Sequence, residues 1–270
     1  MQASDLYQPE VRDQFIDQAH STYTAAEHRV WDILFARQSH ILRDRAHPDF
    51  FRGLAKLSLG RGGVPDFAVL SEELYALTGW EVRAVSGLVS DYAFFSYLSQ
   101  RIFVSGRFIR RPEQLDYLQE PDVFHDIFGH VPMLANPIFA DYMQAYGEGG
   151  LRSLEFGALH KLARLYWYTV EFGLIQTPEG LRAYGAGITS SAKESIYSLE
   201  SPDATRQAFS LERILQTRYQ IDSLQAGYFV IDSFEQLLNT TLNTDFGPLY
   251  RSLASAPEFE PDDVAYLSES

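Results

Sequence analysis

Cysteine is absent from the 270 residues of the chain. This absence excludes disulfide bonds, iron–sulfur clusters, cysteine-ligated zinc sites and a thiolate nucleophile. A metal bound by this protein must therefore be held by histidine, aspartate, glutamate, tyrosine or backbone oxygen atoms.

Long apolar runs and an excess of positive charge are also missing. No stretch approaches the roughly 18 apolar residues of a membrane-spanning helix, and residues 1–15 lack the apolar core of a signal peptide. The formal net charge is −14, and such a surface repels phosphate backbones. We therefore expect a cytoplasmic protein with neither a membrane nor a nucleic acid as partner.

The remaining composition is that of an ordinary globular protein, with 46% hydrophobic and 21% charged residues. Aromatic residues stand at 14%, which is on the high side, and core filling is the simplest explanation. The length allows one domain or two small ones.

Helical patterns dominate the chain. The pair Thr24 and Glu27 forms a capping box, which predicts the start of a helix; apolar residues follow at helical spacing from Val30, and Pro48 ends it. Further helices are expected at residues 65–78 and 90–100. Most of residues 120–175 should be helical, with the longest helix at about 154–172. Two more helices are expected to begin near residues 210 and 233. Short strands are expected at about 80–85 and 228–231, with a hairpin around residues 105–106.

No internal repeat, low-complexity tract or clear linker divides the chain, and the strands are too scattered for a parallel sheet. The sequence therefore predicts a mainly α protein: a single catalytic domain of packed helices with a few short β-strands at residues 22–250. A polar N-terminal arm is expected at residues 1–21, and an acidic C-terminal tail at 251–270, frayed from residue 257.

Two of the seven histidines lie in apolar surroundings, namely His125 and His130. Five residues along an ideal helix rotate the chain by about 500°, which leaves the two side chains about 140° apart. Gly129 and Pro132 indicate that the helix ends there and lets His130 turn toward His125. Two buried, hydrogen-bonded histidines explain this pair alone better than a metal site does. The other five lie among charged residues and are expected at the surface: His20, His28, His40, His47 and His160.

Glu171 is a carboxylate in an almost wholly apolar run, residues 165–174. Burying such a group without a partner costs several kcal/mol, so it requires either an ion pair with an arginine or a metal. Two histidines and one carboxylate form the ligand set of non-haem iron(II) oxygenases. A zinc hydrolase is disfavoured, because no glutamate that could act as general base lies between His125 and His130.

Four blocks of sequence, in order, carry a family resemblance: Thr78-Gly-Trp-Glu-Val-Arg83 followed by Gly87-Leu88, then residues 120–132, 166–173 and 184–191. Together they extend over roughly residues 22–250. In these blocks the chain resembles the pterin-dependent aromatic amino acid hydroxylases, most closely the bacterial members that hydroxylate phenylalanine. The resemblance implies that His125, His130 and Glu171 bind Fe(II), and that the second cofactor is tetrahydrobiopterin or a related reduced pterin.

For the substrate, the resemblance implies that Arg110 pairs with the amino acid carboxylate, and that Trp167 and Ser190 line the pocket. Val230 matches a position where phenylalanine hydroxylases carry valine and tyrosine hydroxylases carry aspartate. From the residues alone, Arg110 is better explained as a surface charge beside Arg111, and Trp167 and Val230 as core residues.

For the pterin, the resemblance implies that Phe94 stacks on the ring system and that Gly87, Leu88 and Asp126 line the same site. It also implies that the hydroxyl of Tyr166 points toward pterin and iron. Each of these residues alone is equally consistent with a core or capping position.

The implied reaction is the hydroxylation of L-phenylalanine to L-tyrosine with O2 and a tetrahydropterin, as in phenylalanine catabolism. Hydroxylation of tyrosine or tryptophan, and non-catalytic binding of an aromatic amino acid or pterin, remain alternatives. We expect a monomer with hyperbolic phenylalanine dependence, because the family block starts near residue 22 and no heptads follow residue 250. A pterin carbinolamine dehydratase is an expected functional partner.

Overall fold

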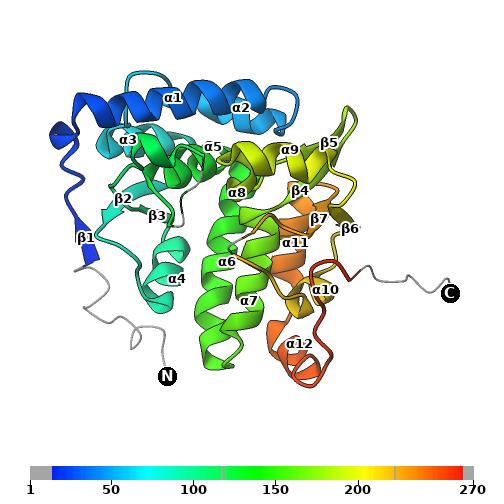
Figure 1. The fold of residues 1–270 in the computed structure, drawn as a ribbon. Coiled ribbons are helices and arrows are strands. Elements are labelled where there is room, and N and C mark those ends of the chain that lie inside the picture. The colour runs from blue at the N-terminus through cyan, green and yellow to red at the C-terminus, as the bar shows by residue number, and fades with distance from the viewer. Residues whose placement is uncertain (1–13, 117, 119, 222, 264–270) are drawn as a thin grey trace.

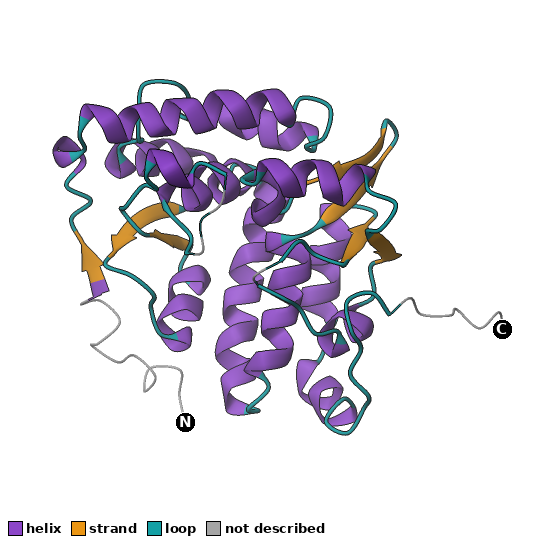
Figure 2. Cartoon of the chain, in the orientation of Figure 1, coloured by secondary structure: helices purple, strands orange, loops and turns teal. Residues whose placement is uncertain are grey.

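The computed structural model describes residues 14–116, 118, 120–221 and 223–263. Helices form most of this part of the chain, and the strands are short and few (Figure 2). In Figure 1, α1 and α2 lie across one end of the molecule, and α6 and α7 run side by side away from them. The predicted mainly α architecture is confirmed.

The N-terminal helices are α1 (Ala25–Ile41), α2 (Pro48–Lys56), α3 (Phe67–Thr78) and α4 (Asp91–Ser99). Of these, α1, α3 and α4 lie close to their predicted positions, although α1 ends before Pro48, which begins α2. The capping box is formed: Thr24 Oγ1 accepts from the backbone N–H of Glu27 at 3.3 Å, and Glu27 Oε2 accepts from that of Thr24 at 2.7 Å. Gly79 ends α3 with φ = 75°, a conformation that glycine adopts without strain.

The later α-helices surround the centre of the molecule. They are α5 (Val131–Leu134), α6 (Pro137–Glu155), α7 (Leu159–Tyr166), α8 (Ala186–Thr189), α9 (Ala192–Glu200), α10 (Leu211–Gln216), α11 (Phe234–Asn243) and α12 (Phe246–Ser252). Two π-helices, η5 (Phe124–His130) and η6 (Trp167–Glu171), lie within this region, and the short 3-10 helices are η3 (His20–Thr22) and η4 (Pro112–Gln114).

Two small sheets complete the fold. The first sheet contains, in this order, β1 (Phe15–Ile16), β2 (Glu81–Val85) and β3 (Ile102–Ser105). The second sheet contains β4 (Leu174–Thr177), β5 (Gly180–Ala183), β6 (Thr205–Ala208) and β7 (Gly227–Ile231). Its strand order is β5-β4-β7-β6. The strand pairs β2–β3, β4–β7 and β6–β7 are parallel, which the sequence did not predict. The hairpin around residues 105–106 is wrong, because residues 106–109 form no strand and β3 pairs instead with β2, in parallel, after the α4 crossover.

The longest helix is α6, not the predicted element at residues 154–172. Gly147 and Gly150 lie inside this helix where α4 packs directly against it. A Cβ on Gly147 would lie 2.4 Å from the backbone nitrogen of Ser99, and one on Gly150 would lie 1.9 Å from Phe95 Cδ1. Close approach of the two helices therefore requires glycine at both positions.

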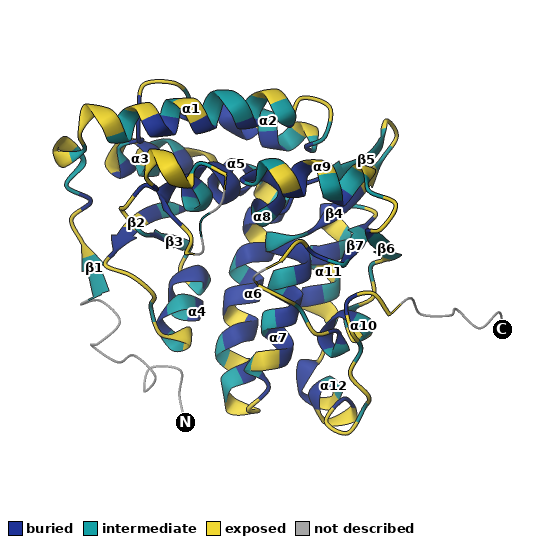
Figure 3. Cartoon of the chain, in the orientation of Figure 1, coloured by how far each residue is buried: buried dark blue, intermediate teal, exposed yellow. Residues whose placement is uncertain are grey.

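Aromatic side chains fill the interior, as their abundance predicted. Figure 3 shows that buried residues recur along α6, α7 and α11. The largest side chains that are completely buried are Trp31, Trp80, Tyr97, Tyr142, Tyr146, Tyr168, Tyr184, Tyr228, Phe50, Phe124, Phe128 and Phe229. No helix in the described part of the chain combines the length and hydropathy needed to span a bilayer.

Three of the five histidines expected at the surface are instead partly buried. His20 and His28 bind the backbone of Val64, and His47 is the N-cap of α2, where its Nδ1 accepts from the backbone N–H of Asp49. Only 16% of the His47 side chain is exposed, and burial lowers its pKa. His40 and His160 are exposed as predicted.

The expected terminal segments are partly built into the fold. Phe15 and Ile16 of the predicted arm pair with β2. At the other end, α12 continues past residue 250, and Phe259 exchanges backbone hydrogen bonds of 2.9 Å with Gln216 and Arg218. Fraying from residue 257 is therefore wrong for residues 258–263, and residues 264–270 lie outside the described part.

The α4–α6 contact makes a testable prediction. Gly147→Ala should lower the free energy of unfolding by roughly 1–3 kcal/mol, because its methyl group would overlap the backbone of Ser99. Gly149→Ala is the matched control, since a Cβ there meets only a flexible arginine at 3.9 Å. Alanine should stabilise the helix at that position by up to about 1 kcal/mol. Equal urea midpoints for both variants would contradict this account.

Candidate metal centre

A π-helix brings the two histidines together. Both lie in η5, whose hydrogen bonds connect residues five apart, so His125 and His130 face the same side on successive turns. Their rings are 5.1 Å apart and perpendicular, at 87°. The expectation that the helix ends at Gly129 is wrong: the helix widens there and continues into α5, with Pro132 in the first turn of α5.

Glu171 reaches the histidines from a second π-helix. η6 continues α7, and the backbone N–H of Phe172 donates to the carbonyl of Trp167, five residues earlier, at 2.8 Å. Glu171 Oε1 lies 3.2 Å from His130 Nε2, and Oε2 lies 3.6 Å from His125 Nε2. One potential ligand atom from each of the three residues lies within 4.8 Å of the others.

The ionisation of these groups suits a divalent metal. Burial lowers the pKa of His125, which favours the neutral imidazole that binds metals. For Glu171, burial acts to raise the pKa, but the nearby imidazoles outweigh it and lower the pKa, which favours the carboxylate. The arginine partner considered for Glu171 is not found among the described residues, where its ion pairs are with His125 and His130.

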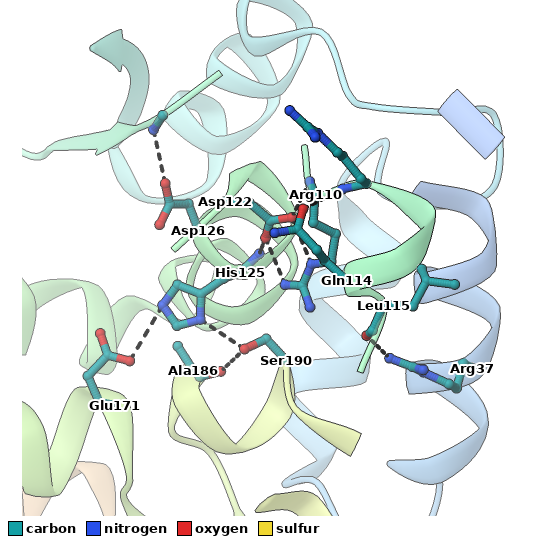
Figure 4. A network of polar contacts seen from close by, with 12 residues as sticks. Arg37, Arg110, Gln114, Leu115, Asp122, His125, Asp126, Glu171, Ala186 and Ser190 are labelled. Carbon is teal, nitrogen blue, oxygen red and sulfur yellow. Dashed lines mark hydrogen bonds and ion pairs between the residues drawn. The ribbon is translucent and has the colours of Figure 1, made fainter. Parts of the chain in front are cut away.

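Ser190 sets the tautomer of His125. Its hydroxyl donates to the carbonyl of Ala186 at 2.7 Å, and its oxygen lies 2.9 Å from His125 Nδ1 (Figure 4). Because that hydroxyl has a single proton, Ser190 accepts from Nδ1–H. His125 Nε2 is then left with its lone pair directed toward Glu171 and His130. Ser190 thus contacts the ring nitrogen of His125 that points away from the candidate metal site. Its predicted contact with the substrate remains a proposal.

Asp122 is a central residue of the site that the sequence analysis missed. It is completely buried and accepts from Arg110 Nε and Nη2, both at 2.8 Å, and from the backbone N–H of His125 at 3.1 Å (Figure 4). Burial acts to raise the pKa of Asp122, but Arg110 outweighs this effect and lowers it. A charged residue in an apolar run three positions before His125 was the available signal. Arg110 is 9% exposed, so the surface-charge interpretation is wrong.

The residues expected around the pterin are only partly brought together. The ring of Tyr166 lies 5.6 Å from that of Phe94 and 6.3 Å from that of His130. Asp126 accepts from the backbone N–H of Gly106 at 3.0 Å, and burial raises its pKa to about 7. Gly87 and Leu88 lie on the loop between β2 and α4, where Leu88 is 99% exposed; within the described residues no hydrogen bond connects them to the histidines.

The two remaining substrate candidates come from different elements. Trp167 opens η6, stacks on Tyr219 at 4.4 Å, and donates from Nε1 to Gln225 at 2.8 Å. Tyr219 was not singled out from the sequence, because a lone tyrosine in a loop carries no pattern. Val230 lies in β7, paired with Leu174 three residues after Glu171, and its half-buried side chain packs against a small apolar cluster.

The fold and this site define a mainly α protein with a candidate two-histidine, one-carboxylate metal centre. A family model described as "Biopterin-dependent aromatic amino acid hydroxylase" matches residues 15–246. The chain belongs to this family, as the resemblance predicted.

Known relatives are similar over most of their length. The chain is 59% identical to a phenylalanine-4-hydroxylase of Caulobacter vibrioides over 246 residues, which cover 91% of this chain and 83% of the relative. It is 57% identical to one of Ralstonia nicotianae, over 90% of this chain and 77% of the relative. Among solved structures, Chromobacterium violaceum phenylalanine hydroxylase with bound oxidized Fe(III) has a TM-score of 0.91 at 53% identity, covering 94% of this chain and 92% of the other. The cobalt-bound form has a TM-score of 0.92.

The contact of Ser190 with His125 predicts its effect on metal binding. Ser190→Ala should weaken Fe(II) binding roughly 10- to 100-fold, because the imidazole loses the partner that fixes its tautomer. Anaerobic titration with Fe(II) measures this effect. Glu171→Ala should abolish binding, and Ser223→Ala, which changes an exposed loop hydroxyl, should leave it unaltered. Unchanged affinity of Ser190→Ala would show that the hydroxyl does not orient the ligand.

Proposed function

We propose that this chain is a phenylalanine 4-monooxygenase that hydroxylates L-phenylalanine to L-tyrosine with O2 and a tetrahydropterin. The observation that carries the proposal is the grouping of two imidazoles and one carboxylate in a member of this family. Similarity of 54–59% to proteins named phenylalanine-4-hydroxylase favours phenylalanine over tyrosine and tryptophan.

His125, His130 and Glu171 would hold the Fe(II). The donor set fits this ion, because neutral imidazoles and a carboxylate are its usual ligands in oxygenases and the set leaves coordination positions open. Bound Fe(II) and the reduced pterin supply the electrons that activate O2. The cobalt- and Fe(III)-bound structures of the Chromobacterium violaceum relative support a metal at this centre.

Arg110 would anchor the substrate carboxylate. Asp122 occupies one side of the guanidinium fork, through Nε and Nη2. Within the described residues Nη1 makes no hydrogen bond, so the side formed by Nη1 and Nη2 is available for a second carboxylate. A fork that is already oriented loses little side-chain entropy when it binds.

The aromatic residues would exclude water and position the two organic molecules. Trp167 would form a wall of the substrate pocket with Ser190 and Val230, while Phe94 and Tyr166 would contact the pterin with Gly87, Leu88 and Asp126. We assign the catalytic domain to residues 22–250, the N-terminal arm to 1–21 and the acidic tail to 251–270. The family match over residues 15–246 supports the central assignment.

Assembly and cofactor recycling are expected to be simple. We propose a monomer with hyperbolic phenylalanine dependence, supported by the way residues 258–263 fold back onto the chain's own α10 and β6. A pterin carbinolamine dehydratase would dehydrate the hydroxylated pterin. A stable tetramer in light scattering would contradict the proposed monomer. A sigmoidal dependence of the rate on phenylalanine would contradict the proposed hyperbolic dependence.

The proposed reaction can be tested directly. Protein reconstituted anaerobically with Fe(II) should form tyrosine when phenylalanine, tetrahydrobiopterin and O2 are added. Glu171→Ala, treated identically, should form none. Phenylalanine binding without product from the reconstituted protein would favour the non-catalytic alternative, and full turnover by metal-free protein would exclude the iron mechanism.

A substitution at Arg110 separates its two partners. Arg110→Lys keeps a positive charge beside the buried Asp122, whereas Arg110→Ala would leave that carboxylate unpaired and confound the result with unfolding. In Arg110→Lys the KM for phenylalanine should rise roughly 10- to 100-fold, the equivalent of a hydrogen bond to a charged group. The KM for the pterin should change much less. If the KM for phenylalanine is the same before and after the substitution, Arg110 pairs only with Asp122 and does not bind the substrate carboxylate.

Selectivity for phenylalanine should depend on Val230. A valine side chain offers no partner to the phenolic hydroxyl of tyrosine, and an apolar pocket rejects an added hydroxyl by about a hundredfold. We expect kcat/KM for phenylalanine to exceed that for tyrosine by this order in a competition assay. Val230→Thr, of nearly the same shape but with a hydroxyl, should narrow the ratio. Equal kcat/KM values for the unaltered protein would refute the assignment.

A further inference from the structure

A cavity lies at the N-terminal end of α7, the helix that continues into η6 and carries Glu171 at its far end. It has a volume of about 400 Å³ and lies between the α6–α7 turn, the start of α7, and α12 with the segment after it. In Figure 1 this region is at the foot of α6 and α7, beside α12. Its lining includes Phe156, His160, Lys161, Tyr250, Arg251 and Glu258.

Lys161 is the first unusual feature of this cavity. Its side chain is only 7% exposed, yet no hydrogen bond or ion pair to its ammonium group is present in the described part of the chain. Burial and the nearby Arg164 lower its pKa. The stem of Lys161 is buried, whereas its ammonium group is not among the buried polar atoms, so it reaches the cavity surface without a protein partner in the described residues. A lysine that buries its stem in this way presents its charge to a ligand at the surface.

The backbone supplies further free donors. α7 starts at Leu159 without a side-chain cap, because its N-cap residue is Ala158. Among the described residues, the backbone N–H groups of Leu159 and His160 have no acceptor. The hydroxyl of Tyr250 is also buried without a partner. Free N–H groups at a helix N-terminus attract anions through both hydrogen bonding and the helix dipole.

The protein neutralises this positive charge only in part. Glu258 is the one carboxylate among the described lining residues, and it acts on Lys161 without a hydrogen bond to it, because its oxygen atoms bind other residues. Its Oε1 accepts from Arg164 at 2.6 Å and its Oε2 from Arg218 at 2.8 Å. Lys161 and Arg251 therefore remain available to a negative ligand.

We propose that this cavity binds a small oxyanion, a phosphate or a carboxylate group. Lys161 supplies a positive charge, the free N–H group of His160 binds an oxygen atom, and Tyr250 donates from its hydroxyl. Arg251 contributes at the rim. The proposal is independent of the function assigned to the metal centre.

Calorimetric titration of the iron-loaded protein tests the site, with inorganic phosphate in one arm and sodium acetate in the other. We expect one anion per chain, and the arm with the tighter binding identifies the group that is recognised. Lys161→Met and Arg251→Gln should each weaken binding at least tenfold. Lys193→Met, at an exposed lysine of α9, should not change it.

Two controls distinguish anion binding in this cavity from anion binding at the metal centre and from a purely structural role of Lys161. Glu171→Ala without metal should still bind the anion, so loss of binding in that variant would place the anion on the iron and overturn the proposal. In anion-free buffer Lys161→Met should melt close to the unaltered protein, because methionine keeps the packing of the buried stem and the ammonium group has no protein partner to lose. The proposal also fails if neither anion binds, or if binding survives both Lys161→Met and Arg251→Gln.

Discussion

The contact of Glu171 with two imidazoles is the interaction around which the site is built. It depends on two π-helical turns, one that aligns His125 with His130 and one that ends at Glu171. Each wide turn must be held by its neighbours, since π-helical segments are rare and isolated. α8 provides that support. A Cβ on Gly129 would lie 3.0 Å from the carbonyl of Ala186, and one on Gly185 would lie 2.4 Å from that of Glu171. The close approach of α8 to both π-helices is also what brings Ser190 to His125.

A series of buried polar contacts connects this centre to the candidate substrate anchor. Arg110 pairs with Asp122, Asp122 binds the backbone N–H of His125, and His125 faces Glu171. Asp122 is completely buried, so its charge requires the guanidinium of Arg110. The orientation of the guanidinium and the position of the first histidine are therefore set by one carboxylate. The candidate substrate anchor and the candidate metal ligand are thus connected through Asp122 without any direct contact.

Local signals in the sequence predicted much of the fold, and long-range packing decided the rest. The capping box at Thr24 and the glycine at residue 79 act within one helical turn, so the sequence alone could predict the helix ends that they form. The hairpin failed because the partner of β3 is chosen by the α4 crossover, which no turn signal encodes. The length of α6 was not predicted, because Gly147 and Gly150 are explained by the facing helix α4 and not by the local chain.

The candidate metal ligands were identified from residue type and the family resemblance, whereas their geometry was not predicted. A 3.6-residue period places His125 and His130 on different faces, and only the widened turn corrects this. Asp122 escaped notice because its importance lies in a partner twelve residues away, Arg110. The pterin candidates Gly87 and Leu88 rest on resemblance alone, since an exposed loop provides no packing evidence.

Residues that follow the family match at 15–246 help to position Trp167, a wall of the candidate substrate pocket. Glu258 holds Arg218, whose neighbour Tyr219 stacks on Trp167, and the hydroxyl of Tyr168 donates to the carbonyl of Arg218. Glu258 also holds Arg164 on α7, on the same rod that carries Trp167 and Glu171. Because η6 continues α7 without a break, the C-terminal segment, Trp167 and the carboxylate of Glu171 are attached to one continuous helical segment.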